Sequence, residues 1–276
     1  MAISMSSPPA VEDVIITAPR PHILLVTINR PKQLNCIRHD MHYQLDRLWT
    51  WFDAEPALRC AVVTGMGRAF CAGADLKEWN ERNARPEGEP SKKAPASGFG
   101  GLSNRRGKKP VIAAVNGLCL GGGMEMILNV DMVIASVDAR FALPEVARGV
   151  VPIQGALPRL IRSVGMQRAS EMALLGRIYK ADEMLRWGLV NHVIARGSDV
   201  VGEALQWAIE LADNSPDSVI VARQGLLSGW DPEDPQESTR RILNDVYAKM
   251  DGGDNMTEGV RAFVEKRKPI WKDSKL

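Results

Sequence analysis

Two glutamates in this sequence follow apolar segments that end in tight turns. Glu125 follows the letters GGGM, and Glu145 follows the letters FALP. Two carboxylates in a partly dry pocket can divide acid and base roles, because their surroundings separate their pKa values. The pair therefore predicts proton-transfer chemistry. Taken singly, each glutamate also fits an exposed residue in the first turn of a helix.

Two glycine-containing turns lie beside these acids in the sequence. The first spans Phe70 to Asp75 and reads FCAGAD, and the second spans Gly117 to Glu125 and contains three consecutive glycines. Glycine leaves backbone N–H groups open to a ligand, and a helix beginning near Gly122 would add its own unpaired N–H groups. If the turns meet, they form an oxyanion hole. Either turn alone is typical of close packing, and Asp75 alone is typical of a helix cap.

Other catalytic patterns are missing from the chain. It has no GxSxG, GxGxxG or P-loop sequence. The four cysteines form no CxxC pair and are expected to be reduced and mostly buried: Cys36, Cys60, Cys71 and Cys119. Only Cys36 has histidines nearby in sequence, at His39 and His42, and no fourth ligand accompanies them. No metal site is expected.

The overall composition is that of a globular protein with little net charge. Of 276 residues, 45% are hydrophobic and 25% are charged, and 35 basic against 33 acidic residues give a net charge of +2. This balance predicts no binding to nucleic acid or to an anionic membrane. No window approaches the ~18 apolar residues that a membrane span requires.

The two ends of the sequence carry different signals. The first residues lack the basic start and apolar middle of a secretory signal. The last three, Ser274, Lys275 and Leu276, match the tripeptide that directs proteins to peroxisomes. The alternative is chance, because polar tails are often rich in serine and lysine. We expect recognition by the peroxisomal import receptor, and a cytoplasmic location otherwise.

Apolar runs and helical patterns alternate through the first two-thirds of the chain. Strands are expected at 14–17, 23–28, 58–64, 111–115 and 132–135, and helices at 41–52 and 124–130. This alternation predicts an α/β layer architecture with mainly parallel strands. From about residue 154 the pattern is almost wholly helical, most clearly at 200–212, 218–227 and 237–250.

The last predicted helix spans about 256–267. Asn255 and Glu258 have the spacing of a capping box. Val260, Phe263 and Val264 form one apolar stripe. A helical extension of this kind often packs on a neighbouring subunit.

The segment from Asn83 to Pro110 is rich in proline, glycine and basic residues. It predicts a mobile loop near a site. Its basic residues would either meet phosphates or remain solvated, and they comprise Lys92, Lys93, Arg105, Arg106, Lys108 and Lys109.

The ordered motifs resemble the crotonase (enoyl-CoA hydratase/isomerase) superfamily over nearly the whole chain. They read AFCAGADLKE at 69–78, KPVIAAVNG at 109–117, GGGMEM at 121–126, FALPEVARGVVP at 141–152 and AFVEKRK at 262–268. Within the superfamily the chain is similar to hydratases and carnitinyl-CoA dehydratases. The resemblance implies an α/β fold with a ββα spiral core at 1–200 and a C-terminal helical trimerisation region at 201–276. It also implies a homotrimer or a dimer of trimers.

The resemblance also assigns roles. It implies that the N–H groups of Ala74 and Gly122 hold the thioester oxygen of an acyl-CoA, and that Glu125 and Glu145 are the hydratase acid/base pair. Coenzyme A enters as part of the substrate, with no separate cofactor. Further contacts with CoA or substrate are implied for Ala72, Asp75, Leu76, Lys77, Gly121, Phe263 and Lys266.

One departure concerns the acyl pocket. After Pro152 the hydratase pattern is usually glycine-rich, whereas this chain reads IQGAL at 153–157, so its acyl preference is expected to differ. The expected reaction is the addition of water to the 2,3 double bond of an enoyl-CoA, or its reverse. The alternatives are carnitinyl-CoA dehydration, double-bond isomerisation, and a non-catalytic scaffold or RNA-binding role. The glutamate pair and the near-neutral charge argue against the last.

Overall fold

The computed structural model describes residues 5–84 and 94–276, and it contains two sheets. The larger sheet has the strand order β1-β2-β3-β5-β7-β10, in which only β1 and β2 pair antiparallel. Its strands are β1 (Val14–Arg20), β2 (Ile23–Ile28), β3 (Cys60–Gly65), β5 (Val111–Val115), β7 (Met132–Ser136) and β10 (His192–Ile194).

The smaller sheet consists of very short strands in the order β4-β6-β8-β9. These are β4 (Ala69–Cys71), β6 (Leu118–Leu120), β8 (Arg140–Ala142) and β9 (Tyr179–Lys180). Each of β4, β6 and β8 follows a strand of the larger sheet and precedes a helix, and these helices are α2 (Leu76–Asn83), α3 (Gly122–Ile127) and α4 (Ala156–Val164). This threefold strand–strand–helix repeat is the ββα spiral that the sequence predicted.

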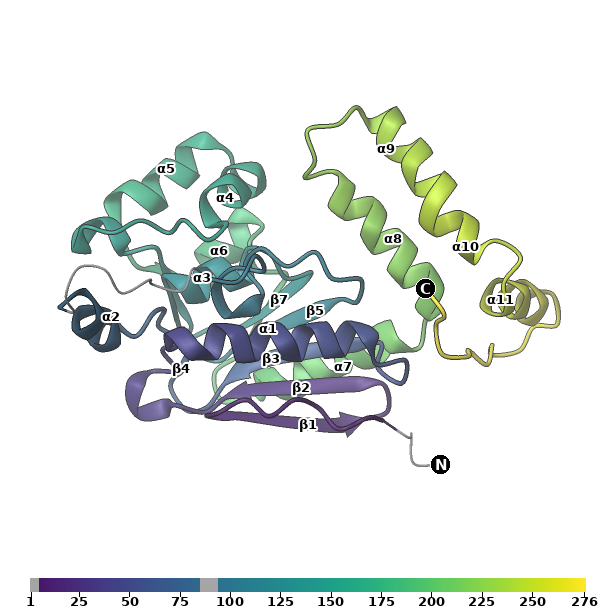
Figure 1. The fold of residues 1–276 in the computed structure, drawn as a ribbon, viewed down its shortest axis with the longest axis horizontal. Helices are drawn as coiled ribbons and strands as arrows, with labels where there is room; N and C mark the ends of the chain where they lie inside the picture. The colour runs from purple at the N-terminus through teal and green to yellow at the C-terminus, as the bar shows by residue number, and fades with distance from the viewer. Residues whose placement is uncertain (1–4, 85–93) are drawn as a thin grey trace.

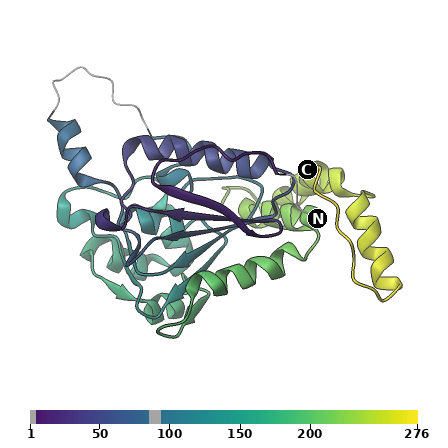
Figure 2. The ribbon, with the colours of Figure 1, turned by 90° about the horizontal axis from the view of Figure 1, so that it is seen from below.

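Burial on both faces of the larger sheet explains its apolar strands. In β3, Ala61 and Val63 face the larger core cluster, whereas Cys60 and Val62 face a second cluster beneath α7 (Val200–Ala212). Figure 2 shows α1 and α7 on opposite sides of the sheet. Parallel strands covered on both faces read as continuous apolar runs, which is why the strands were recognisable in the sequence.

Helix α1 (His39–Ala54) places its predicted apolar stripe in the larger cluster. The buried apolar residues of that stripe lie on one face over about three turns, and they are Met41, Leu45, Leu48, Trp49 and Phe52. The helix ends just before Pro56, since the residue preceding a proline disfavours helical geometry. Two further helices follow α4 before α7, namely α5 (Met166–Leu175) and α6 (Ala181–Trp187).

The C-terminal helices lie to one side of the α/β body (Figure 1). They are α8 (Pro216–Ser228), α9 (Pro235–Ile242), α10 (Ala248–Met250) and α11 (Asp254–Val264), with a π-helical segment at Leu243–Tyr247. Ser215 caps α8 and Asp234 caps α9, and each helix begins with proline, which suits a first helical turn. The domain division at residue 200 and the trimerisation role of the later helices remain predictions.

The predicted capping box at the last helix is wrong. The helix begins at Asp254 with Gly253 as its N-cap, so Asn255 lies inside it. The Asn255 side chain donates to Asp217 Oδ2 at 2.7 Å, and Glu258 accepts from Arg267 instead of from the helix start. Tertiary partners here replace the local hydrogen bonds that the spacing suggested.

The prediction that the basic residues of the 83–110 segment are solvated or meet phosphates is wrong for Arg105 and Lys109, and the mobility of the segment stays a prediction. Arg105 and Lys109 are buried, Arg105 donates to Asp53 Oδ1 at 2.5 Å, and Lys109 donates to the Phe52 carbonyl at 2.9 Å. Both side chains bind the last turn of α1, so neither is solvated or free for a phosphate. Lys92 and Lys93 lie outside the described residues.

Across residues 5–84 and 94–276, no helix combines the length and apolar character needed to span a bilayer. The same residues contain no cluster of three or more histidine, cysteine, aspartate or glutamate side chains that could hold a metal ion. The four cysteines are unpaired, and all but the half-buried Cys36 are buried, as expected from the sequence.

Candidate active site

The two glycine turns lie next to each other because their strands pair. Strands β4 and β6 are parallel neighbours, so the turns that follow them leave the same edge of the smaller sheet. A β-carbon on Gly73 would lie 3.2 Å from the Gly122 nitrogen. Gly73 also has φ = +97°, a conformation that other residues rarely adopt. The close approach that the sequence only suggested is therefore present.

Ala74 and Gly122 present backbone N–H groups without a protein acceptor. Ile37 bonds on either side of Ala74, donating to the Gly73 carbonyl at 2.9 Å and accepting from the Asp75 N–H at 3.1 Å, which turns the Ala74 N–H away from Ile37. Gly122 opens α3, where the first N–H groups have no partner within the helix. Within the described residues, neither N–H has a hydrogen-bond partner.

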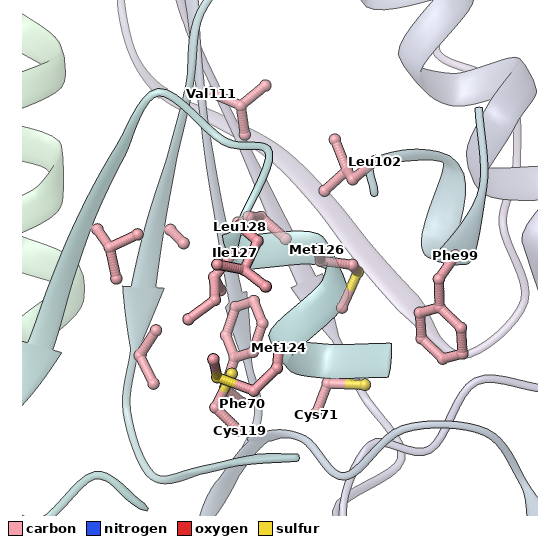
Figure 3. Packing of buried hydrophobic residues seen from close by; sticks show 14 of the residues in the cluster. Phe70, Cys71, Phe99, Leu102, Val111, Cys119, Met124, Met126, Ile127 and Leu128 are labelled. Carbon is pink, nitrogen blue, oxygen red and sulfur yellow. The ribbon is translucent and has the colours of Figure 1, made fainter. Parts of the chain in front are cut away.

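Phe99 packs its ring directly against the α-carbon of Gly122. Its ring lies where a β-carbon of residue 122 would be, so only glycine fits there. Phe99 begins the short 3-10 turn Phe99–Gly101, in which the Gly100 N–H donates to His42 Nδ1 and its carbonyl accepts from Trp49 Nε1, both at 3.0 Å. Figure 3 shows Phe70, Cys119 and Met124 clustered on one side of α3 and Phe99 on another. Sequence reasoning did not assign Phe99 to the site.

Glu125 lies in the first turn of α3 and is only 3% exposed. Its Oε1 accepts from the Gln154 N–H at 2.8 Å. Burial raises the pKa of Glu125 to about 7, and the charge of Glu145 adds to the rise, while the N–H groups of Gln154 and Ala156 oppose it. The carboxyl group can therefore hold or release a proton near neutral pH.

Glu145 begins the 3-10 turn Glu145–Arg148, directly after Pro144. A β-carbon on Gly121 would lie 3.0 Å from Glu145 Oε1, so the carboxylate lies against the N-cap residue of α3. Burial raises the pKa of Glu145, against the charge of Arg148. Its Oε2 is buried without a hydrogen-bond partner among the described residues. The structure thus places Glu145 against Gly121, next to Gly122, and close enough to Glu125 for its charge to raise the pKa of Glu125.

The buried cysteines at this place do not compete as nucleophiles. Cys71 and Cys119 lie on the paired strands β4 and β6. Burial raises the pKa of both thiols well above the ordinary value, which disfavours the reactive thiolate. The arrangement suits acid/base chemistry beside an oxyanion site.

The remaining predicted contact residues fall into two groups. Those in or next to the turns are Ala72, Asp75, Leu76, Lys77 and Gly121. Burial acts to raise the pKa of Asp75, but its ion pair with Arg30, at 3.1 Å, contributes to a net lowering of that pKa. Phe263 and Lys266, by contrast, lie in α11 and just after it. Figures 1 and 2 both place α11 at the end of the molecule opposite α2. A single chain does not bring these two residues to the glutamates.

The C-terminal tripeptide lies against the protein surface. The Ser274 hydroxyl donates to Asp217 Oδ1, and the Leu276 N–H donates to the Ser274 hydroxyl at 3.1 Å. Lys108, one of the basic residues expected to meet phosphate or solvent, instead donates to the Leu276 carbonyl.

Comparison with known proteins gives consistent matches. Residues 20–274 match the family model described as enoyl-CoA hydratase/isomerase. The mevalonyl-coenzyme A hydratase of Beauveria bassiana is 64% identical over 274 residues, with 98% of each chain covered. The mevalonyl-coenzyme A hydratase of Aspergillus fumigatus is 50% identical over 274 residues, covering 99% of this chain and 100% of its own.

More distant relatives agree with this placement. The carnitinyl-CoA dehydratase of Proteus mirabilis is 36% identical over 258 residues, covering 92% of this chain and 96% of its own. The crystal structure of enoyl-CoA hydratase from Mycobacterium tuberculosis H37Rv aligns with a TM-score of 0.81 at 32% identity, covering 95% of this chain and 99% of that chain.

Proposed function

The chain belongs to the enoyl-CoA hydratase/isomerase family, as the sequence resemblance predicted, and we propose that its substrate is mevalonyl-CoA and the corresponding 2,3-enoyl thioester. It is a hydro-lyase of CoA thioesters. Two relatives with the same printed activity, at 64% and 50% identity, support mevalonyl-CoA over the carnitinyl ester of the 36% relatives.

The reaction removes water from, or adds it to, the acyl group next to the thioester. Mevalonyl-CoA carries hydroxyls on C3 and C5 and a methyl group on C3. In dehydration, the C2 proton leaves to a base, the C2–C3 double bond forms, and the C3 hydroxyl takes a proton and leaves as water. Hydration is the reverse, in which water attacks C3 and C2 gains a proton. Coenzyme A is part of the substrate, and these steps call for no separate cofactor.

The proposed residue roles follow from the contacts at the site. The N–H groups of Ala74 and Gly122 hold the thioester oxygen, on which negative charge develops when the C2 proton leaves. One carboxylate of the pair Glu125 and Glu145 is ionised and accepts a proton, and the other is protonated and supplies one. The observation that carries this assignment is a pair of interacting carboxyl groups with raised pKa values, of which Glu145 lies against Gly121, together with two N–H groups that have no acceptor among the described residues.

A direct assay tests the reaction. Purified protein incubated with mevalonyl-CoA should form a product lighter by one water, and the conjugated thioester should appear in the ultraviolet spectrum. Glu125→Gln and Glu145→Gln should each lower kcat by about 10²–10⁴-fold, the usual contribution of a general acid or base. Circular dichroism should show that both variants remain folded. Turnover of both variants at the parent rate would contradict the assignment.

Carnitinyl-CoA and 3-hydroxybutyryl-CoA, which also carry a C3 hydroxyl, serve as comparison substrates in the same dehydration assay. The three acyl groups differ in polarity and charge, so each would pair with different polar groups of the acyl pocket. The ratios of their kcat/KM values therefore show which of the three substrates the enzyme prefers. A higher kcat/KM for either comparison substrate than for the mevalonyl ester would remove mevalonyl-CoA as the proposed substrate.

We also propose that the chain assembles as a trimer or a dimer of trimers. The apolar stripe of α11 faces outward, and Phe263 is 85% exposed in the single chain. Large apolar side chains gathered on one surface often mark a subunit interface. The parent protein should have the mass of three or six chains by light scattering, and Phe263→Glu should lower it. A parent protein with the mass of a single chain would contradict assembly.

A peroxisomal location is a further proposal, based on Ser274, Lys275 and Leu276. Import by the receptor would require the tail to leave Asp217 and Lys108, which now bind Ser274 and Leu276. Fluorescent fusions carrying the intact tripeptide at the carboxyl end should enter peroxisomes in a eukaryotic cell, and Leu276→Asp should keep them in the cytoplasm. Equal distribution of both fusions would contradict the proposal.

A further inference from the structure

Gln154 is fixed to the glutamate site by its backbone. Its N–H donates to Glu125 Oε1 at 2.8 Å, and its carbonyl accepts from the Ser103 hydroxyl at 2.6 Å. Ser103 is fully buried and in turn accepts from the Phe99 N–H at 2.6 Å. These bonds hold the Gln154 α-carbon close to Glu125, so its side chain begins within the site.

The Gln154 side chain has no hydrogen-bond partner in the part of the chain that the structure describes. Its Oε1 is buried and lacks a hydrogen bond among the described residues, and Glu145 Oε2 shares this condition. Buried polar atoms are nearly always paired, because an unpaired one loses its bonds to water without replacement. One of these atoms belongs to the residue whose backbone binds Glu125, and the other to the glutamate that lies against Gly121, so the two point to a polar ligand that supplies the missing partners.

The chemistry of a carboxamide defines that ligand. Glutamine both donates and accepts, and a hydroxyl group is the simplest partner that can do the same. A hydrocarbon chain at this position would leave Oε1 unpaired. A reacting C3 between the glutamates puts the C5 hydroxyl two carbons further along the acyl chain, within reach of a side chain that starts beside Glu125.

We infer that Gln154 is a specificity-determining residue that binds a hydroxyl carried by the acyl chain beyond C3. This inference rests on the proposed function, in which that hydroxyl is the one on C5 of the mevalonyl group. Gln154 does not take part in proton transfer. It makes the enzyme select hydroxylated over purely hydrocarbon acyl groups.

Two substrates with one carbon skeleton test this directly. They are 5-hydroxy-3-methylpent-2-enoyl-CoA and 3-methylpent-2-enoyl-CoA, which lacks the hydroxyl. The quantity measured is the ratio of their kcat/KM values for hydration. Gln154→Met keeps the length of the side chain and removes its hydrogen bonding, and it leaves the backbone bonds to Glu125 and Ser103 in place.

The ratio for Gln154→Met should fall by about 10- to 100-fold from that of the parent, because a buried hydrogen bond to the hydroxyl is lost. A general disturbance of Glu125 lowers both rates and cancels in the ratio. Gln206→Met, an exposed glutamine on α7 across the sheet, serves as the matched control and should keep the parent ratio.

The outcomes separate the two proposals. A parent enzyme that prefers the hydroxylated substrate, with an unchanged ratio in Gln154→Met, would overturn the role of Gln154 and leave the mevalonyl assignment standing. A parent enzyme without any preference for the hydroxyl would overturn both proposals.

Discussion

Gly121 lies directly against the carboxylate of Glu145, so that a β-carbon at residue 121 would be 3.0 Å from Oε1. Gly121 also has φ = +54° and forms the N-cap of α3, which carries Glu125. One glycine therefore sets the spacing between the two glutamates and the start of the helix that presents the Gly122 N–H.

Gly121→Ala should lower kcat/KM by roughly 10²-fold, because displacing a catalytic group by about 1 Å has an effect of that size. Part of any loss will come from the positive φ alone. Gly188→Ala provides the control, since Gly188 has φ = +80° and no atom within 4 Å of its β-carbon position. Equal activity losses in both variants would show that the Glu145 contact does not matter.

The raised pKa of Glu125 makes the stability of the protein depend on pH. Its pKa is about 7 in the folded chain and 4.5 ordinarily, so the folded state binds more protons between these values. The free energy of unfolding therefore falls as pH rises from about 4.5 through 7, by about 3 kcal/mol in total from this group.

Glu125→Gln removes the destabilisation that arises when the buried Glu125 carboxyl group ionises. The variant should be more stable than the parent by roughly 1–3 kcal/mol at pH 8, where the parent glutamate is ionised, and the difference should nearly vanish at pH 5. Urea denaturation at the two pH values measures it. An equal stability difference at pH 5 and pH 8 would show that Glu125 has an ordinary pKa.

Much of the fold could be predicted from local pattern. The strands at Ile23–Ile28 and Val111–Val115 and the helix Val200–Ala212 have the predicted bounds. The two strands are short continuous apolar runs, and the apolar residues of the helix repeat with its period, and both are local properties. The smaller sheet was not recognised as a layer, because strands of two or three residues are too short to show a period.

The site was partly predictable for a different reason. Glu125 and the two turns stood out because glycine and acid types were adjacent in sequence. The hydrogen bonds of Gln154 could not be predicted from local pattern, because its partners are distant in the sequence: Ser103 is 51 residues away and Glu125 is 29 away. Arg105 and Lys109 were misassigned for the same reason, because their acceptors near Asp53 come from a distant helix.

Arg223 provides the last prediction, because it ties α8 to the α/β body. It is buried, and its Nε donates to Asp131 Oδ1 at 2.7 Å, while Asp131 Oδ2 accepts from the Val111 N–H at 2.8 Å. Arg223→Met removes this charge-assisted hydrogen bond from a partly exposed Asp131 carboxylate and should lower the free energy of unfolding by about 1.5–3 kcal/mol. Arg196→Met breaks the exposed pair with Asp138, also at 2.7 Å, and should cost at most about 1 kcal/mol. The N–O distance is the same in both ion pairs, so urea denaturation of the two variants compares a buried arginine with an exposed one. Similar decreases in the free energy of unfolding would mean that burial does not strengthen the Arg223 contact.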